Sequence, residues 1–317
     1  MRARRKFSGL SSRVRFLGSE RGETHARWYR TVADHYDFLY DPQRVAKAYP
    51  FLHDLFRRRE PVLDVLDVAC GTFALDLPLL KRGYRIVGRD VSKDMLRVAR
   101  RRLTAARRSA DLGQADMRSL ELNRKFDAVL CLGTAFNYLV ASDEIRMALR
   151  GFRRHLRPGG LLVLDLTNFD GWIRNPQNVR AEVDYHAPDG TRVAIFAFNE
   201  QDLRHSLHHA RFLTVVRKDD RIDVGFDEAP LRIWTKNNLA QVLRSTGFQP
   251  VEWWGGPAPW REVRAVPKPT ACLRVHAALD RVIAGRDACG IPSCAARRRS
   301  LAAGMHFRAE NHRTCSA

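Results

Sequence analysis

The sequence has no stretch of about 18 uncharged apolar residues, so it predicts no membrane-spanning helix. Its arginine- and serine-rich beginning has no apolar segment of the kind found in secretory signals. Cysteine is scarce, and the six cysteines form no C-x-x-C pair, so no metal site is predicted. These absences favour a cytoplasmic protein with reduced thiols.

Acidic residues are too few to balance the basic ones: 55 Lys and Arg against 35 Asp and Glu give a net charge of +20. The excess lies mainly at the two ends. Residues 1–24 contain seven basic and two acidic residues, and residues 261–317 contain eleven and four. Positive charge alone gives non-specific affinity for nucleic acid, so this distribution permits a nucleic-acid partner without favouring one.

Strand and helix patterns alternate through the middle of the chain, which is typical of a parallel sheet covered by helices. Strands are expected at 62–69, 84–90, near 113–115, and at 126–132, 161–167 and 249–256, the first of them buried. Helices are expected at 92–108, 142–156 and 235–248, the first of them capped by Ser92. We therefore expect a Rossmann-like, doubly wound α/β fold with a mostly parallel sheet.

After Asp170 the pattern changes to extended segments, two of which are joined across the turn sequence "PDG". We expect these segments to form an antiparallel β insertion at 171–232, after the fifth strand, that roofs a substrate site. It would belong to a main domain at 25–256. Residues 1–24 are expected to be a disordered basic arm, and residues 257–317 a disordered basic tail that contains cysteine.

The turn after the first strand, "ACGT" at 69–72, has small residues that let a ligand approach the backbone. Asp90 ends the second strand, where its carboxylate would reach across to this turn and accept two ribose hydroxyl groups. A nicotinamide enzyme would also show the G-x-G-x-x-G fingerprint, which "ACGTFA" lacks. The pattern therefore indicates a nucleoside ligand without a pyrophosphate.

Four blocks resemble the class I S-adenosylmethionine-dependent methyltransferases over residues 28–256. They are "VLDVACGT", "GRDVSKDML", "ADMRSL", and "FDAVLCLGTAFNYL" with "HLRPGGLLVLDL", in this order and at fitting spacings. Upstream, "HYDFLY" resembles the tyrosine-bearing helix of small-molecule N-methyltransferases of the amino-sugar and glycine types. The resemblance implies a methyltransferase with S-adenosylmethionine as its cofactor.

The resemblance also implies roles for individual residues. Asp67 would hold the turn, Asp90 would bind the ribose, and Asp116 would accept a hydrogen bond from the adenine amine. The implied cofactor contacts are Tyr36, Asp67, Ala69, Gly71, Thr72, Asp90, Met95, Asp116, Met117 and Leu132. Tyr36 and Tyr138 are the implied catalytic residues. Structural alternatives stay open. Methionine is usually a core residue, so Met95 and Met117 could serve packing alone. Tyr36 and Tyr40 are four residues apart, a helical spacing at which they could form a core pair.

Two features depart from the family. Phe73 occupies a position where members usually carry glycine, so its side chain must either point into the helix–sheet interface or intrude on the pocket. We expect the first. In addition, family sheets end with a seventh strand, for which "TACLRV" at 270–275 is a poor candidate.

The expected function is methyl transfer to a small molecule, with an amine as the favoured acceptor. The protein would mainly align the reacting atoms, and a tyrosine or a histidine would take the proton of the amine, with Tyr36 and Tyr138 as the candidates. Two alternatives stay open. The basic ends permit RNA methylation, and a pocket closed by Phe73 would leave a non-catalytic binding domain.

Overall fold

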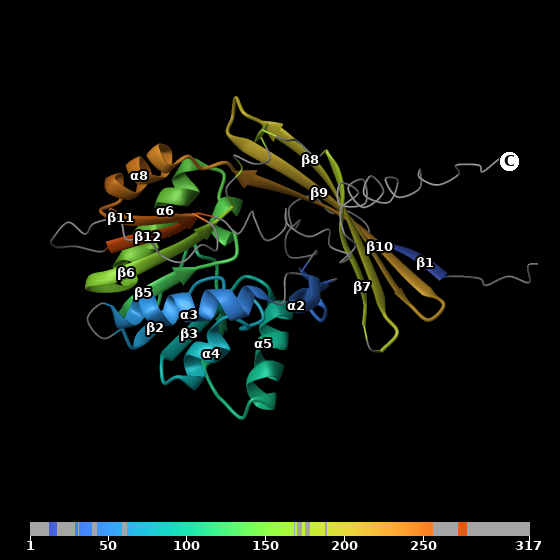
Figure 1. Ribbon diagram of the computed structural model, residues 1–317, viewed down its shortest axis with the longest axis horizontal. Coiled ribbons are helices and arrows are strands. Elements are labelled where there is room, and N and C mark those ends of the chain that lie inside the picture. Colours follow the sequence, from blue (N-terminus) through green and yellow to red (C-terminus); the bar gives the residue numbers. More distant parts are fainter. Residues whose placement is uncertain are drawn as a thin grey trace, which may run out of the picture.

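The computed structural model describes residues 13–17, 29–30, 32–39, 43–58, 62–167, 169, 173–174, 178–187, 189–255 and 272–277. These residues form two sheets (Figure 1). One sheet has seven strands in the order β11-β12-β6-β5-β2-β3-β4, and the other has five in the order β1-β10-β9-β8-β7.

All paired strands of the seven-stranded sheet run parallel. Its members are β2 (Asp64–Asp67), β3 (Arg85–Asp90), β4 (Asp111–Gln114), β5 (Phe126–Cys131), β6 (Leu156–Leu166), β11 (Gln249–Gly255) and β12 (Cys272–Ala277). The six predicted strands are all present, within a few residues of their expected bounds. The largest difference is at β6, which begins directly where helix α6 ends rather than after the two glycines.

Helices cover both faces of this sheet (Figure 1). On one face lie α3 (Gln43–Arg57), α4 (Asp76–Lys81) and α5 (Lys93–Ala105), and on the other lie α6 (Ser142–His155) and α8 (Lys236–Ser245). Successive strand residues serve opposite faces: Val65 packs with the α3–α5 cluster and Leu66 with the α6–α8 cluster. The predicted cap is present, because the Ser92 hydroxyl accepts the N–H of Met95 at 3.3 Å. No described helix is long and apolar enough to cross a membrane. The predicted doubly wound α/β fold is confirmed.

The second sheet is the predicted antiparallel insertion. Its strands β7 (Val179–His186), β8 (Arg192–Asp202), β9 (Leu207–Lys218) and β10 (Arg221–Arg232) pair antiparallel in sequence order. At the "PDG" turn between β7 and β8, the N–H of Ala187 donates to the Thr191 carbonyl at 2.7 Å. The inner face of the sheet packs Val193 and Ile195 against Val32, near helix α2 (Tyr36–Leu39).

Two further strands come from segments that the sequence analysis assigns to disordered ends. Strand β1 (Arg13–Leu17) pairs parallel to β10, and β12 lies between β6 and β11. The expectation that a seventh strand is missing is therefore wrong. Because β12 pairs parallel to both of its neighbours, it forms no hairpin whose turn would mark it in the sequence. The remaining residues of 1–24 and of 257–317 lie outside the described residues.

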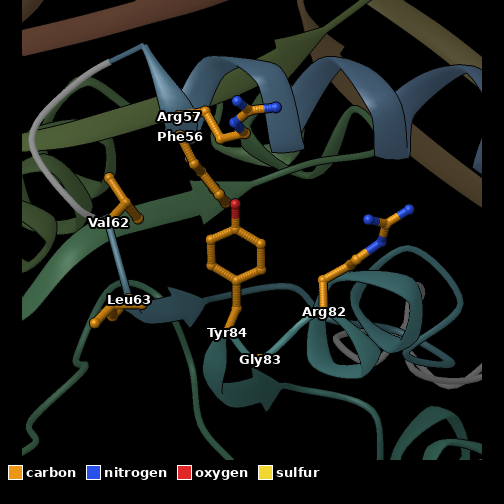
Figure 2. A pocket seen from close by; sticks show the side chains of 7 residues that line it. All are labelled: Phe56, Arg57, Val62, Leu63, Arg82, Gly83 and Tyr84. Carbon is orange, nitrogen blue, oxygen red and sulfur yellow. The ribbon is translucent and has the colours of Figure 1, made fainter.

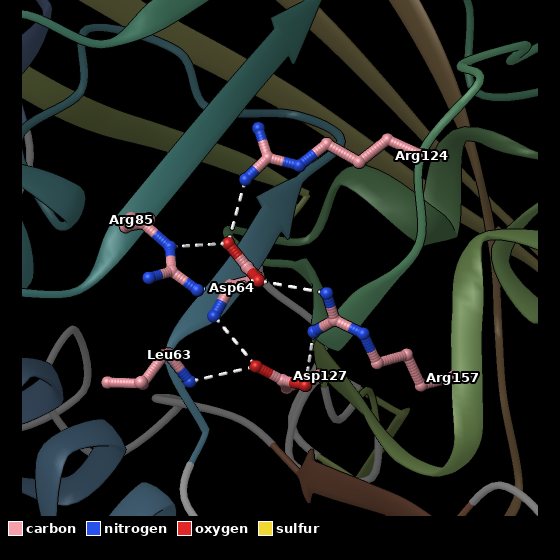
Figure 3. A network of polar contacts seen from close by, with 6 residues as sticks. All are labelled: Leu63, Asp64, Arg85, Arg124, Asp127 and Arg157. Atoms are coloured by element: carbon pink, nitrogen blue, oxygen red, sulfur yellow. Dashed lines mark hydrogen bonds and ion pairs between the residues drawn. The ribbon is translucent and has the colours of Figure 1, made fainter.

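A cluster of charges ties the amino ends of four strands together (Figure 3). It lies at the end of the sheet opposite the turn that follows β2. Asp64, which is 4% exposed, accepts hydrogen bonds from Arg85, Arg124 and Arg157. Asp127 bonds Arg157 and accepts the N–H of Asp64 at 2.8 Å. The Arg85 guanidinium, with the other two, holds the pKa of Asp64 far below its usual range. This cluster holds the amino ends of the strands together. The candidate site therefore lies at the other end of the sheet, where the strands have their carboxyl ends.

Candidate active site

The turn after β2 is held open by its backbone. Gly71 adopts a φ of +52°, and apart from its two chain neighbours no described residue has an atom within 4 Å of the place that a Cβ would take there. The carboxylate of Asp67 accepts the N–H of Ala69 at 3.0 Å, and the N–H of Cys70 donates to the carbonyl of Arg89 at 3.0 Å. Asp67 therefore bonds a backbone donor of the turn, and its cofactor contact stays a prediction. The space beside Gly71 leaves room for the close approach of a ligand.

Asp90 joins the carboxyl ends of β2 and β3. One carboxylate oxygen accepts the N–H of Gly71 and the other accepts the N–H of Ser92, each at 2.8 Å. Burial raises the pKa of Asp90, and the two N–H donors oppose that shift. Each oxygen can accept a second hydrogen bond, so the side chain is still able to bind a pair of hydroxyl groups. Its reach across to the turn agrees with the sequence analysis, and its ribose contact stays a prediction.

Phe73 does not lie over the turn. Its side chain has no exposed area and packs in the interface between α3, α4 and the sheet, with Phe51, Leu55 and Leu79. The backbone nevertheless keeps a φ of +61°, a left-handed conformation that favours glycine. The expected orientation is thus confirmed, and the alternative of a domain closed by Phe73 loses its physical basis.

Behind the turn, Asp76 forms a carboxyl pair with Asp67. Asp76 is 1% exposed, in the first turn of α4. Its burial and the adjacent Asp67 carboxylate raise the pKa of Asp76 well above its usual range. A protonated Asp76 can donate to Asp67, whereas two ionised carboxylates would repel each other. The sequence did not indicate this role of Asp76, because one acidic residue in the apolar run "LDLPLL" carries no sign of burial.

The predicted adenine side of the site is built around an ion pair. Asp116 follows β4 and accepts the N–H of Arg118 at 2.8 Å, and both of its oxygens also bond the Arg118 guanidinium. Burial acts against it, but Arg118 lowers the pKa of Asp116. Met117 packs partly buried against the α6 side of the core. Arg118 therefore shares the acceptor that was predicted for adenine alone.

Two other predicted cofactor contacts are core residues. Met95 is 1% exposed and packs with Ala33 and Val98 between α5 and the N-terminal segment. Leu132 is buried at the end of β5, in the cluster on the α3–α5 face. Their packing role is established here, and contact with a cofactor stays a prediction for both.

Three tyrosines gather beside the turn. The rings of Tyr29 and Tyr36 meet edge to face with their centroids 5.9 Å apart, and both pack against Met95. Tyr138 ends the short helix η1 (Ala135–Tyr138) after β5, and its hydroxyl interacts with Tyr29 and Tyr36. Burial of the hydroxyl and the proximity of Tyr36 raise the pKa of Tyr138 to about 12. The structure thus brings the two predicted catalytic tyrosines together and adds Tyr29, which sequence reasoning missed.

The tyrosine-bearing segment is bound directly to the turn. The hydroxyl of Thr72 donates to Asp37, which also bonds Arg102 of α5. Thr72 is 3% exposed, so it serves this attachment in addition to any cofactor contact. Asp37 belongs to the "HYDFLY" block, but the sequence alone did not indicate its role, because its partners are distant in the chain.

The second sheet contacts the carboxyl ends of the parallel strands at Asn137 and Phe169, which follow β5 and β6. The side-chain amide of Asn137, which is fully buried, donates to the carbonyl of Arg232 in β10 at 2.8 Å. Phe169 packs beside Tyr138 and lies with its ring centroid 4.7 Å from that of His208 in β9. Burial lowers the pKa of His208 to about 4, so this ring is neutral at physiological pH. Phe169 and the insertion together place apolar and neutral polar groups beside the tyrosines.

A separate pocket lies at the opposite edge, among Phe56, Arg57, Val62, Leu63, Arg82, Gly83 and Tyr84 (Figure 2). Its residues precede β2 and β3, so it is not part of the candidate site. No group of three or more His, Cys, Asp or Glu side chains within the described residues is arranged to hold a metal ion.

Residues 65–160 match a family model described as a methyltransferase domain. A glycine/sarcosine N-methyltransferase from Halorhodospira halochloris is 32% identical over 226 residues, which are 70% of this chain and 79% of that protein. A dTDP-3-amino-3,4,6-trideoxy-alpha-D-glucopyranose N,N-dimethyltransferase from Streptomyces venezuelae is 37% identical over 149 residues, which are 44% of this chain and 61% of the relative. The match to a glycine/sarcosine enzyme of Parasynechococcus marenigrum covers 53% of that relative. The chain thus spans between half and two thirds of these last two curated relatives.

Solved structures with the same fold support this comparison. The amino pentose methyltransferase CalS10 from Micromonospora echinaspora, determined with S-adenosylmethionine bound, is 27% identical with a TM-score of 0.52, over 64% of this chain and 82% of that one. The sugar N-methyltransferase KedS8 from Streptoalloteichus is 23% identical with a TM-score of 0.57, over 73% and 86%. Because KedS8 is only 23% identical to this chain, its similarity shows the fold alone.

Proposed function

The chain belongs to the S-adenosylmethionine-dependent methyltransferases, and from that premise we propose that it methylates an amine nitrogen of a small molecule. The observation that carries the proposal is the contact between Asp90 and Gly71, which places a buried carboxylate beside an open turn. The acceptor class rests on the relatives named as N-methyltransferases of amino sugars and of glycine.

The residues at the turn fit S-adenosylmethionine. The free space at Gly71 admits the methionine part, and Asp90 keeps an unused acceptor position on each oxygen for the ribose hydroxyl groups. Met117 and Leu132 offer apolar surface, and Asp116 an acceptor, at the ends of β4 and β5 for the base. When bound, this cofactor supplies an activated methyl group on a sulfonium.

The remaining task of the chain is to present a neutral amine in line with that methyl group. Buried surroundings without charged groups favour the uncharged form of an amine, and Phe169 with neutral His208 and neutral Tyr138 provide them. With a pKa of about 12, the Tyr138 hydroxyl can orient an amine by hydrogen bonding but is a poor proton acceptor at neutral pH. We therefore propose that Tyr138 and Tyr36 position the acceptor and that its proton leaves to solvent.

The test is transfer of labelled methyl from S-adenosylmethionine to a panel of acceptors: a nucleotide-linked amino sugar, its hydroxyl analogue without the amine, glycine, sarcosine and total RNA. We expect labelling of at least one amine and none of the hydroxyl analogue. Asp90→Ala should abolish the activity, and Glu121→Gln, which changes an exposed carboxylate, should retain it. Labelling of RNA alone would instead establish the RNA alternative, which nothing in the described residues supports.

A further inference from the structure

A pocket at the amino ends of β2 and β3 lies apart from the candidate active site (Figure 2). It has a volume of about 340 Å³, which is at the lower end of the range for sites that bind small molecules. This amino-end pocket is lined by Phe56, Arg57, Val62, Leu63, Arg82, Gly83 and Tyr84. Its lining thus combines apolar and aromatic side chains with two cations.

The aromatic wall of the amino-end pocket is fixed by helix α3. The Tyr84 hydroxyl lies 2.9 Å from Nδ1 of His53. The Tyr84 ring meets that of Phe56 edge to face, at a centroid distance of 5.3 Å. Tyr84 and Phe56 are both buried, so packing holds the two rings in place. Because the wall is shaped before a ligand binds, little conformational entropy is lost on binding.

Arg57 and Arg82 reach the pocket from two different helices. Arg57 is the last residue of α3, and Arg82 follows α4. Figure 2 shows Arg57 near the Tyr84 hydroxyl, and Arg82 on the side of the ring away from Val62 and Leu63. Burial raises the pKa of Tyr84, and the charges of Arg57 and Arg82 both oppose this rise, so both guanidinium groups lie near the hydroxyl. Within the described residues, no carboxylate forms an ion pair with either arginine.

Other arginines at this end of the sheet have acidic partners. Arg58 pairs with Asp54 at 2.7 Å, and three guanidinium groups surround Asp64. The helix dipole favours a cation at the carboxyl end of a helix, which gives Arg57 and Arg82 each a structural role. The dipole does not explain why both cations line one pocket that also has apolar walls. With no carboxylate partner for them in the described part of the chain, the pocket is suited to an anion.

We propose that the amino-end pocket binds a small organic anion. Its apolar body lies against Tyr84 and Leu63, and its phosphate or carboxylate group contacts the two arginines. Guanidinium groups bind the oxygens of either group through paired N–H donors. The six residues of β3, roughly 20 Å, separate this pocket from the candidate active site. The anion therefore binds together with the cofactor, and the inference does not depend on the proposed function.

Calorimetric titration of the full-length chain tests the proposal, at about 150 mM salt so that long-range attraction is screened. The probes are phenyl phosphate, benzoate, inorganic phosphate and benzyl alcohol. At least one of the two aromatic anions should bind, with one molecule per chain, and the tighter of them identifies the anionic group. Inorganic phosphate lacks the ring and benzyl alcohol lacks the charge, so both should bind more weakly. Absence of binding by either aromatic anion, or competition with S-adenosylhomocysteine, would overturn the proposal.

Charge variants assign the binding to the pocket. Arg57→Gln and Arg82→Gln should each weaken binding of the aromatic anion about tenfold or more, since each removes a charged hydrogen bond. Arg58→Gln is the matched control, because it removes the same charge from the same end of α3. Its side chain pairs with Asp54 and does not line the pocket. Equal weakening in Arg58→Gln would show attraction by net charge alone and would contradict the proposal.

Leu63→Glu tests the apolar wall. Leu63 is 44% exposed, so the variant should fold, and a carboxylate at this position should abolish binding by repelling the anion. Leu203→Glu is its control, because Leu203 is 56% exposed in the turn between β8 and β9. Thermal unfolding verifies that each variant is folded without reference to the cofactor. Binding that survives Leu63→Glu would place the anion outside this pocket and refute the assignment.

Discussion

The carboxylate of Asp90 accepts the backbone N–H of Gly71 at 2.8 Å and so couples the end of β3 to the turn after β2. This single contact shapes the turn and also fixes the oxygen atoms that are proposed to receive the ribose. Loss of the carboxylate should therefore reduce both the order of the turn and the affinity for the cofactor.

For Asp90→Asn, we expect binding of S-adenosylhomocysteine to weaken about 10- to 100-fold. The amide presents a donor where the carboxylate accepts two N–H groups, and charged hydrogen bonds contribute about 1.5–3 kcal/mol. Calorimetric titration measures the change, with Glu121→Gln as the control. Unaltered affinity in Asp90→Asn would show that the nucleoside lies elsewhere.

At position 73 we expect glycine to give a more stable protein than alanine, the reverse of the usual order. Either Phe73→Ala or Phe73→Gly opens a cavity in the core and should cost about 3–5 kcal/mol of unfolding free energy. Glycine alone relieves the positive φ, so Phe73→Gly should be more stable than Phe73→Ala by about 1 kcal/mol. Urea denaturation of both variants gives the difference. Tighter cofactor binding in Phe73→Gly would contradict the observed orientation of the ring.

The Asp67–Asp76 pair should make stability fall as the pH rises. The folded state binds a proton at Asp76 that the unfolded state releases near pH 3.8, the ordinary value for this group. Between that pH and the raised folded pKa, stability therefore decreases by about 1.4 kcal/mol per pH unit. Asp76→Asn keeps a donor to Asp67 without this proton, so it should gain on wild type as the pH increases from 4 to 8. Urea denaturation across this range measures the unfolding free energy of wild type and of Asp76→Asn, with Glu121→Gln as the control variant. If the free energies of wild type and Asp76→Asn change with pH in parallel, Asp76 does not hold the proton.

His208 should make the stability of the folded state fall as the pH becomes acidic. Its folded pKa of about 4 lies below the ordinary 6.5, so only the unfolded state takes up a proton between these values. Stability that is present above pH 6.5 is lost as the pH falls towards 4, by up to about 3 kcal/mol. In His208→Gln this loss should disappear. Thermal unfolding at pH 7 and pH 5 measures it, and an equal loss in the variant would assign the acid sensitivity to other groups.

For Tyr138→Phe we expect a kcat about 10- to 100-fold lower and an unchanged affinity for S-adenosylhomocysteine, since the hydroxyl is proposed to orient only the acceptor. The pH dependence should be the same in wild type and variant up to about pH 10, because Tyr138 does not ionise in that range. A rising limb present in wild type and absent in Tyr138→Phe would instead make this tyrosine the base.

The order of strands and helices around the turn could be predicted because each leaves a local signal. Val65 and Leu66 belong to an apolar run covered on both faces, and Ser92 stands at the start of an amphipathic helix. Strand β12 could not be predicted in the same way, because it pairs parallel to both β6 and β11 and so forms no hairpin with either.

Within the site, the positions of Asp67 and Asp90 followed from the ends of their strands. The pairing of Asp67 with Asp76 and of Thr72 with Asp37 did not. Such contacts depend on how helices dock on the sheet, and the spacing of residues in one sequence does not encode that docking.

The hydrogen bond from Thr72 to Asp37 has a kinetic consequence. Asp37 lies on the segment that carries Tyr29 and Tyr36, and Asp34 of the same segment binds Arg97 and Arg101 of α5. A molecule that displaces Thr72 also loosens this attachment, so occupancy of the turn and docking of the segment are thermodynamically linked. Exchange of spent cofactor would then be paced by the breaking of exposed ion pairs, and its rate should increase with salt.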